Sequence, residues 1–238
     1  MTATRRTQLL NGLTLGSVLL FIVANLMAFA YPGQEQTMGQ VQRIFYIHLG
    51  SFFAATLAFI VTVLGGIAYL RTRNPKWDVL AHSGVEIGLA LSTVTTVTGA
   101  IWAKPIWGTY WTWDPRLTTI AIMWLTYAAY LFLRQAIDNP DQRRRFASVY
   151  GVLAFGSVIL TIVIVRVRPD VIHPTVAGPT TSGDALGSFN MTPRIAQTVL
   201  FNIFAYCVIA VALLWHRLRL EEEAEALQVR KAEALGRL

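Results

Sequence analysis

The chain has 238 residues, of which 54% are hydrophobic and only 14% are charged, and its formal net charge is +7. Soluble domains usually carry about 25% charged residues, so this composition excludes a soluble globular protein and indicates an integral membrane protein. The single cysteine, Cys207, excludes an intramolecular disulfide, and the sequence has no C-x-x-C motif that would form a dithiol redox centre.

Six apolar segments follow one another along the chain, and each is long enough to cross about 30 Å of hydrocarbon as a helix. Extended segments are excluded because lipid cannot satisfy open backbone groups. The six segments comprise residues 9–30, 45–70, 79–103, 117–137, 146–165 and 195–216. We therefore predict an all-α integral membrane protein with six transmembrane helices. Residues 1–216 are expected to form a single membrane domain and residues 217–238 a helical tail.

The first apolar segment resembles a signal peptide, because it follows Arg5 and Arg6 and ends in the sequence Ala28-Phe29-Ala30. Its apolar stretch of about 20 residues is, however, longer than the stretch of about 7–15 residues that signal peptides usually contain. We therefore expect this segment to remain in the protein as its first transmembrane helix.

The basic residues are divided unequally between the two sides of the membrane. Of the 20 Lys and Arg residues, 14 lie in the N-terminus, the 71–78 and 134–145 connections and the C-terminal tail, and six lie elsewhere. Positively charged connections stay on the cytoplasmic side, so we expect both termini to be cytoplasmic. The positive net charge then reflects membrane orientation and does not indicate binding to nucleic acid.

Two of the four histidines are candidate ligands. His48, in RIFYIHLGSFF, lies about one turn below the predicted outer surface, where a polar ring must find a partner. His173, in VIHPTVAGP, lies in the outer segment 166–194, on the same predicted side. His82 and His216 end helices on the opposite side, where a role as a polar anchor explains them.

Glu86 lies about two turns into the third apolar segment, where a carboxylate is costly unless it is paired or protonated. Thr95, Thr96 and Thr98 follow it and are candidates to line the same face or to bond across helices. We favour a structural role for Glu86 and leave open a role in passing a ligand or protons.

Residues 107–116, WGTYWTWDPR, hold three tryptophans and a tyrosine in the outer connection 104–116. Asp114 and Pro115 are suited to start the fourth helix, as N-cap and first helical residue. Tryptophan and tyrosine are common at membrane interfaces, but a belt spreads such rings over several helix ends. Crowded rings separated by Gly and Thr predict an apolar platform, formed by Trp102, Trp107, Tyr110, Trp111 and Trp113.

Outer cations near this platform indicate a ligand with negative edges, although pairing with nearby carboxylates is an equally good explanation. They are Arg43, Lys104, Arg116, Arg166 and Arg168. A flat, apolar ligand that is anionic at its rim and bound near two histidines describes haem, since imidazole is a common axial ligand of haem iron. A quinone or another lipid-like ligand remains the alternative.

The segment TGAIWAKPIWGTYWTWDPRLTTIAIMWL resembles the tryptophan-rich WWD segment of the haem exporter protein C family, and QRIFYIHLG resembles the segment that carries its first outer histidine. The resemblance extends over most of the chain, and the six-span plan also matches. WWD segments occur as well in related haem lyases and cytochrome c synthases. The small size, the six spans and the histidine just after the first connection favour the exporter branch.

The resemblance implies a non-enzymatic protein of the bacterial inner membrane that binds haem b transiently and non-covalently at the periplasmic face, during the biogenesis of c-type cytochromes. Implied partners are a membrane-anchored periplasmic haem chaperone and an ABC transporter complex with membrane, ATPase and small membrane subunits. Axial iron ligation maps onto His48 and His173. The haem platform maps onto Trp107, Gly108, Tyr110, Trp111, Trp113 and Asp114, and the propionates are expected at Arg43, Lys104 and Arg116.

This chain departs from the family pattern at two places. Tyr110 stands where a tryptophan is frequent, and the sequence before His173 lacks the aromatic, Asn-rich lead-in of the family's second histidine. Two other functions stay open. One is a cytochrome c synthase subunit that forms thioether bonds, and the other is a quinone-binding or transport subunit.

Overall fold

Six long helices make up the computed structural model, which describes residues 3–35, 38–168, 170–174 and 192–235. Each helix is long and apolar enough to cross a membrane, and the described residues contain no β-strand. The predicted six-helix membrane fold is therefore confirmed. The helices are α1 (Ala3–Ala30), α2 (Gln42–Thr72), α3 (Pro75–Trp107), α4 (Pro115–Ala136), α5 (Pro140–Val167) and α6 (Pro193–Leu235).

The same two-residue signal starts three of these helices. An Asn or Asp in the extended conformation accepts a backbone N–H of the first turn, and a proline takes the first helical position, where no N–H is needed. The predicted start of α4 is confirmed, because Asp114 accepts a hydrogen bond from the Arg116 backbone N–H at 2.9 Å. The pairs are Asn74-Pro75, Asp114-Pro115 and Asn139-Pro140.

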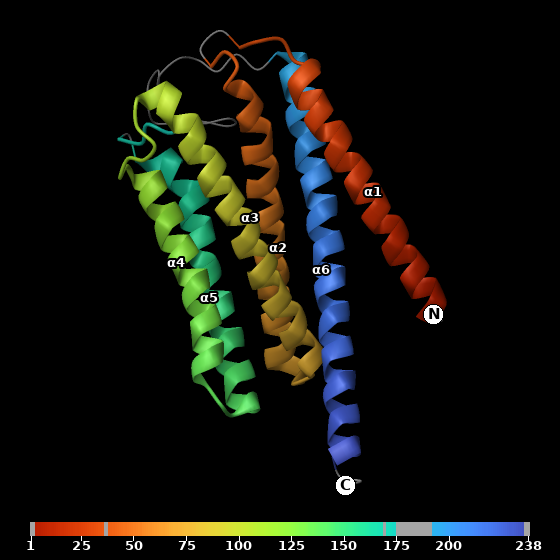
Figure 1. Ribbon diagram of the computed structural model, residues 1–238. Helices are drawn as coiled ribbons and strands as arrows, with labels where there is room; N and C mark the ends of the chain where they lie inside the picture. The colour runs from red at the N-terminus through yellow and green to blue at the C-terminus, as the bar shows by residue number, and fades with distance from the viewer. Residues whose placement is uncertain (1–2, 36–37, 169, 175–191, 236–238) are drawn as a thin grey trace.

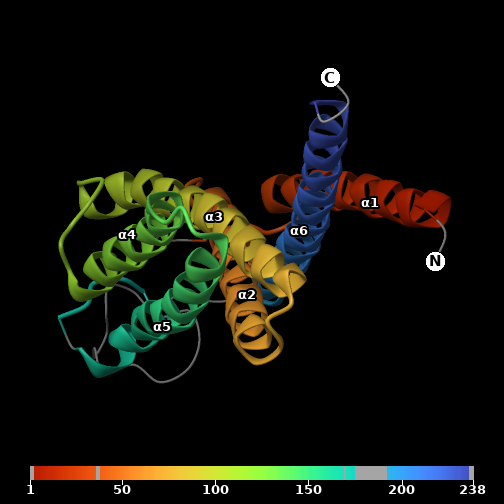
Figure 2. The same ribbon diagram turned by 90° about the horizontal axis from the view of Figure 1, so that it is seen from below.

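Helix α2 lies at the centre of the bundle and packs against α3, α5 and α6, while α1 packs chiefly against α6 (Figures 1 and 2). The last residues of α1, α3 and α5 and the first residues of α2, α4 and α6 lie at one end of the bundle, the upper end in Figure 1, and the start of α1 and the end of α6 lie toward the lower end. Helix α6 continues beyond the predicted boundary at residue 216 to Leu235, so the described part of the tail extends the last helix.

Close packing of α2 on α3 depends on a small residue at the contact. A Cβ atom on Gly84 of α3 would lie 2.5 Å from the Thr62 hydroxyl and 2.7 Å from the Ala58 carbonyl oxygen of α2. The Thr62 hydroxyl also donates to the Ala81 carbonyl of α3 at 3.1 Å. Small residues that let backbones approach are typical of membrane helix pairs, and here they join α2 and α3 into one unit.

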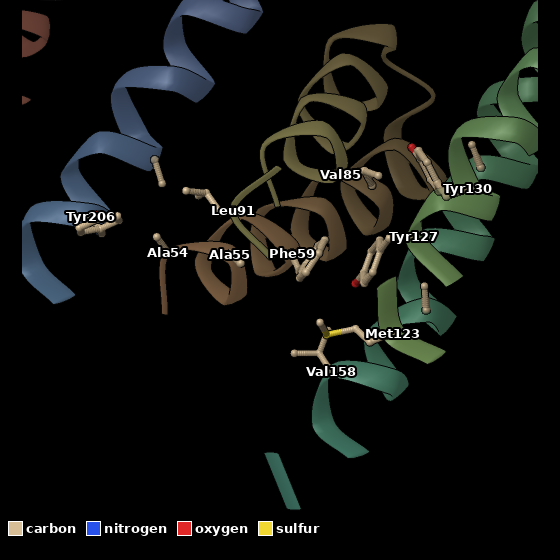
Figure 3. Close-up of a cluster of buried hydrophobic side chains, with 13 residues drawn as sticks. Ala54, Ala55, Phe59, Val85, Leu91, Met123, Tyr127, Tyr130, Val158 and Tyr206 are labelled. Carbon is tan, nitrogen blue, oxygen red and sulfur yellow. The ribbon is translucent and has the colours of Figure 1, made fainter. Parts of the chain in front are cut away.

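Helix α4 joins this unit through stacked aromatic rings. The rings of Phe59 on α2 and Tyr127 on α4 are 3.7 Å apart between centroids and nearly parallel, and both are buried (Figure 3). Met123, one turn before Tyr127, and Val158 of α5 extend the same cluster of buried side chains. The bundle therefore has a continuous apolar core below its upper end.

Ion pairs hold the lower end together. Arg134 of α4 donates to both carboxylate oxygens of Asp78 on α3, at 2.6 and 2.9 Å, and Asp78 is only 3% exposed. Glu86 of α3 is paired with Arg217 of α6 at 2.6 Å. Its predicted structural role is thus supported, but its partner is Arg217, whereas Thr95 contacts His48 and Ser51 toward the upper end.

We expect Asp78→Ala to lower the free energy of unfolding by about 3–5 kcal/mol, because it leaves the Arg134 guanidinium buried without its carboxylate. Denaturation of the purified protein in mixed detergent micelles measures this change. The matched control is Asp138→Ala, which alters an exposed carboxylate in the α4–α5 connection. An equal loss of stability in both variants would contradict the assigned role of the buried pair.

Candidate functional site

A cavity of about 60 Å³ lies at the upper end of the bundle, among α2, α3, α4 and the connection that follows α5. Its lining is almost entirely apolar and aromatic, and its polar side chains include two histidines. The lining residues are Phe45, His48, Leu49, Thr95, Thr96, Gly99, Ala100, Trp102, Trp107, Trp111, Leu117, Ile120, His173 and Pro174.

Two imidazole rings from distant parts of the chain meet in this cavity. His48 lies on α2 and His173 in the connection after α5, and their ring centroids are 6.3 Å apart with planes inclined by 32°. The Nδ1 of His48 lies 2.9 Å from the Thr95 carbonyl oxygen, and the Nδ1 of His173 lies 3.0 Å from the Pro174 carbonyl oxygen. A carbonyl only accepts, so each Nδ1 carries the proton. In the neutral ring the lone pair is then on Nε2.

Helix α3 positions His48 through a carbonyl and a glycine. A Cβ atom on Gly99 would lie 3.0 Å from Cε1 and 3.3 Å from Nδ1 of His48, so a side chain at this position would push the ring a few tenths of an ångström away from α3. The Thr95 carbonyl, one turn away on the same helix, orients the ring. Sequence reasoning missed Gly99, although it stands in the quoted stretch TGAIWA of the third segment.

The surroundings of His173 favour its neutral form. Burial lowers the pKa of His173 well below its ordinary value, and the positive charge of Arg116 and the neighbouring His48 act in the same direction. Its ring also meets the ring of Trp107 edge to face, at 6.2 Å between centroids. A neutral imidazole with an unprotonated Nε2 is the form that binds a metal ion.

The tryptophan-rich segment is divided between the cavity and the surface. Trp107 ends α3 and stands at 89° to Trp102, with centroids 5.2 Å apart, and both rings line the cavity. Gly108 follows in the left-handed conformation, with φ of 77°, which turns the chain away from α3. Trp111 then points back to the cavity, and Asp114 caps α4. The predicted platform residues Tyr110 and Trp113 are 58% and 74% exposed and do not line it.

A network from the α1–α2 connection supports Trp102. Its indole N–H donates to the sulfur of Met38 at 3.2 Å. The backbone N–H of Met38 donates to the Glu35 carboxylate, and the Glu35 backbone N–H donates to the side-chain oxygen of Gln42, both at 2.7 Å. Glu35 and Met38 therefore position an aromatic wall of the cavity, a role that sequence reasoning did not assign to them.

A second, larger cavity of about 380 Å³ adjoins the first and shares His48, Leu49, His173 and Pro174 with it. Two cations, Arg116 of α4 and Arg166 of α5, line this second cavity. The Arg116 guanidinium lies over the Phe52 ring at 5.9 Å, and among the described residues its buried Nε has no hydrogen-bond partner. The buried indole nitrogen of Trp111 likewise has no partner in the described part of the chain.

Two of the other expected cations, Arg43 and Lys104, lie outside both cavities. The Arg43 guanidinium lies over the Phe29 ring at 5.3 Å. The Lys104 ammonium donates to the Gly108 carbonyl at 2.8 Å and lies 5.4 Å from the centre of the Tyr110 ring. Of the five expected outer cations, the structure therefore places Arg116 and Arg166 in the cavity that the imidazoles line, and it leaves Arg43 and Lys104 in contacts that shape neighbouring segments.

The arrangement is suited to a metal complex that brings most of its own ligands. With a metal–imidazole bond of about 2 Å, nitrogens on opposite sides of one ion lie about 4 Å apart. The centre of each imidazole ring lies behind its coordinating nitrogen, so the two ring centroids are expected to be farther apart than the two nitrogens. The observed centroid distance of 6.3 Å agrees with this. Among the described residues no three His, Cys, Asp or Glu side chains group into a metal site. Two imidazoles between apolar walls thus fit a planar complex that needs only axial ligands.

Comparison with known proteins agrees with this chemistry. A sequence model of the family described as Heme exporter protein C matches residues 2–233. Heme exporter protein C of Bradyrhizobium diazoefficiens is 26% identical over 188 residues, which cover 79% of this chain and 71% of that protein. The Paracoccus denitrificans protein of the same name is 30% identical over 154 residues, 61% of this chain and 63% of that protein, so the matched region spans less than two thirds of it.

A more distant relative shares only part of the chain. Cytochrome c biogenesis protein CcsA of Synechococcus sp. is 39% identical over 85 residues, which cover 36% of this chain and 28% of that protein.

We expect His173 to remain neutral, with its proton on Nδ1, at about pH 5.5, which is one unit below the ordinary histidine pKa of about 6.5. Nitrogen chemical shifts of ¹⁵N-histidine-labelled protein measure both properties, and His173→Gln assigns the signal. The unfolded chain binds this proton more tightly, so the contribution of His173 to stability falls as the pH drops below about 6.5. A protonated ring, or a proton on Nε2, would contradict the described geometry.

Proposed function

The chain belongs to the heme exporter protein C family, and on that premise we propose that it binds haem non-covalently between His48 and His173 and passes it to a haem chaperone during c-type cytochrome biogenesis. The observation that carries this proposal is the meeting of two imidazoles whose Nδ1 atoms are both held by carbonyls. A carbonyl on one ring nitrogen orients the ring and makes the other nitrogen a better ligand. Haem is here the cargo of the protein.

In the proposed complex each of the two cavities receives one chemical half of haem. The iron lies between the Nε2 atoms of His48 and His173, which both cavities share. The apolar edge of the porphyrin lies against Trp107 and Trp111 in the first cavity, because large aromatic faces favour a flat apolar ligand. The first cavity is small, so its tryptophan walls must move apart when the porphyrin enters.

The propionates of haem lie in the second cavity, where Arg116 and Arg166 supply positive charge. The buried Nε of Arg116, which has no partner among the described residues, is a donor suited to a carboxylate. Of the three residues expected from the sequence to bind the propionates, Arg116 retains this role. Arg43 and Lys104 instead support the segments around the site.

Release requires a partner that reaches the site from the upper end of the bundle. Trp113 and Tyr110 are exposed there, beside the tryptophans that line the first cavity. A chaperone that contacts these rings can present its own iron ligand and displace one histidine. The excess of basic residues at the lower end supports a cytoplasmic position for that end, and in this proposal the haem site faces the outside of the inner membrane. The further partners are the membrane, ATPase and small subunits of an ABC-type complex.

A second function, in which the chain acts as part of a cytochrome c synthase, is compatible with the similarity to a cytochrome c biogenesis protein. The two functions differ in the acceptor of haem. Co-purification of the full chain with a haem chaperone supports the handover function, whereas co-purification with apocytochrome c supports the synthase.

Replacement of either axial histidine tests the site directly. We expect His48→Ala and His173→Ala each to weaken haem binding about tenfold or more and to change the absorption spectrum from six-coordinate to five-coordinate iron. The measurement is the haem content and spectrum of the purified protein. The control is His216→Ala, which removes a ring that bonds Thr14 at the lower end. Unchanged haem content and spectrum in both axial variants would exclude the proposed site.

The placement of the propionates can be tested with haem whose carboxylates are blocked. We expect Arg116→Gln to weaken the binding of haem about tenfold, because hydrogen bonds to charged groups contribute about 1.5 kcal/mol or more. Binding of haem dimethyl ester should not change. The matched control is Arg43→Gln, which alters a cation outside both cavities. A larger loss of haem affinity in the Arg43 variant than in the Arg116 variant would contradict this placement and would favour propionate binding at Arg43.

A further inference from the structure

The second cavity lies between two helices whose backbones are well separated. Within the described residues, α5 and α6 both pack against α2, no Cα atom of one lies within 8 Å of a Cα atom of the other, and Figure 2 shows α2 between them. Ile162 and Val165 of α5 line one side of the cavity, Leu200 and Ile203 of α6 line the other, and α2 contributes Phe52 and Phe53 between them. The cavity is therefore a groove with α2 at its base.

The rim of this groove faces the region that lipid occupies. Leu200, Phe53 and Ile162 are 67%, 44% and 38% exposed, and all three lie inside membrane-spanning helices. Large apolar side chains that are exposed at this depth contact hydrocarbon. The groove thus opens sideways into the bilayer, and its inner end is formed by His48, His173 and Arg116.

The polarity of the groove matches the way haem lies in a membrane. The apolar wall residues lie deeper in the helices than the two arginines, since Arg116 is the second residue of α4 and Arg166 is next to the last of α5. Haem in a bilayer keeps its carboxylates at headgroup level and its apolar edge in hydrocarbon, for the same reason that long cationic side chains reach the interface. A haem that moves sideways into the groove keeps this orientation.

We propose that the haem reaches the imidazole pair laterally from the bilayer, through the opening between α5 and α6. The inference rests on the proposed function, because it concerns the route to the same two histidines. The carboxylates travel along the headgroup level to Arg116 and Arg166, while the ring slides between Ile162 and Leu200. Arrival from water at the upper end would instead require the ring to pass the tryptophans that line the first cavity.

A cross-link across the opening tests this route in protein that has already folded. The variant carries Ile162→Cys and Leu200→Cys in a Cys207→Ala background, in phosphatidylcholine vesicles. Haem is added to the vesicle lipid, and the rate at which the haem absorption band of the protein appears is measured before and after joining the cysteines with a bifunctional maleimide. We expect the cross-link to slow loading about tenfold or more, as closure of a gate does. An unchanged rate would overturn the lateral route.

A second pair of variants separates blocking of the groove from a general effect of bulky residues. Ile162→Trp with Leu200→Trp narrows the opening, whereas Leu153→Trp with Leu213→Trp adds the same rings to exposed positions of the same two helices outside the cavities. We expect slow loading only in the first variant, with the same final spectrum. Equal rates in the two variants overturn the route alone. Absence of a haem spectrum in the unmodified protein and in both variants overturns the proposed function instead.

Discussion

A polar side chain inside hydrocarbon must find its hydrogen-bond partner within the protein, and the arrangement of the upper end follows from how His48 meets this constraint. Its Nδ1 bonds the Thr95 carbonyl of α3, and Gly99 leaves room for the ring. Both contacts require α2 and α3 to lie close together, as the packing around Gly84 allows. The orientation of Nε2, the proposed ligand atom, is thereby decided by the packing of two helices.

The same constraint separates the two ends of the bundle by their chemistry. At the lower end, carboxylates and guanidinium groups satisfy one another, as in the Asp78–Arg134 and Glu86–Arg217 pairs. At the upper end, by contrast, the buried Nε of Arg116 and the indole nitrogen of Trp111 have no hydrogen-bond partner among the described residues. A closed ionic network stabilises the bundle, whereas the unsatisfied groups at the other end are available to a ligand.

The crowded aromatic segment serves three purposes that follow from its backbone. Trp107 and Trp111 line the cavity, Gly108 and Asp114 end one helix and start the next, and Trp113 is left at the surface. The left-handed turn at Gly108 is what sends successive rings in different directions. A single short segment thus supplies a wall of the site and, in the proposed function, a surface for the partner that removes the cargo.

The sequence by itself determined the six helices, the start of α4 at Asp114-Pro115, and the placement of His48 and His173 toward one end. These features depend on the length of each apolar segment, on the capping residues, and on the number of membrane crossings between two residues, all of which can be determined along the chain without knowing how the helices pack. Only the tertiary structure decided which rings face inward, which cations lie beside the imidazoles, and that Glu86 pairs with Arg217. These features depend on how each helix is rotated and how closely it approaches its neighbours. Many distant side chains set that rotation together, and residue spacing along one segment does not encode it.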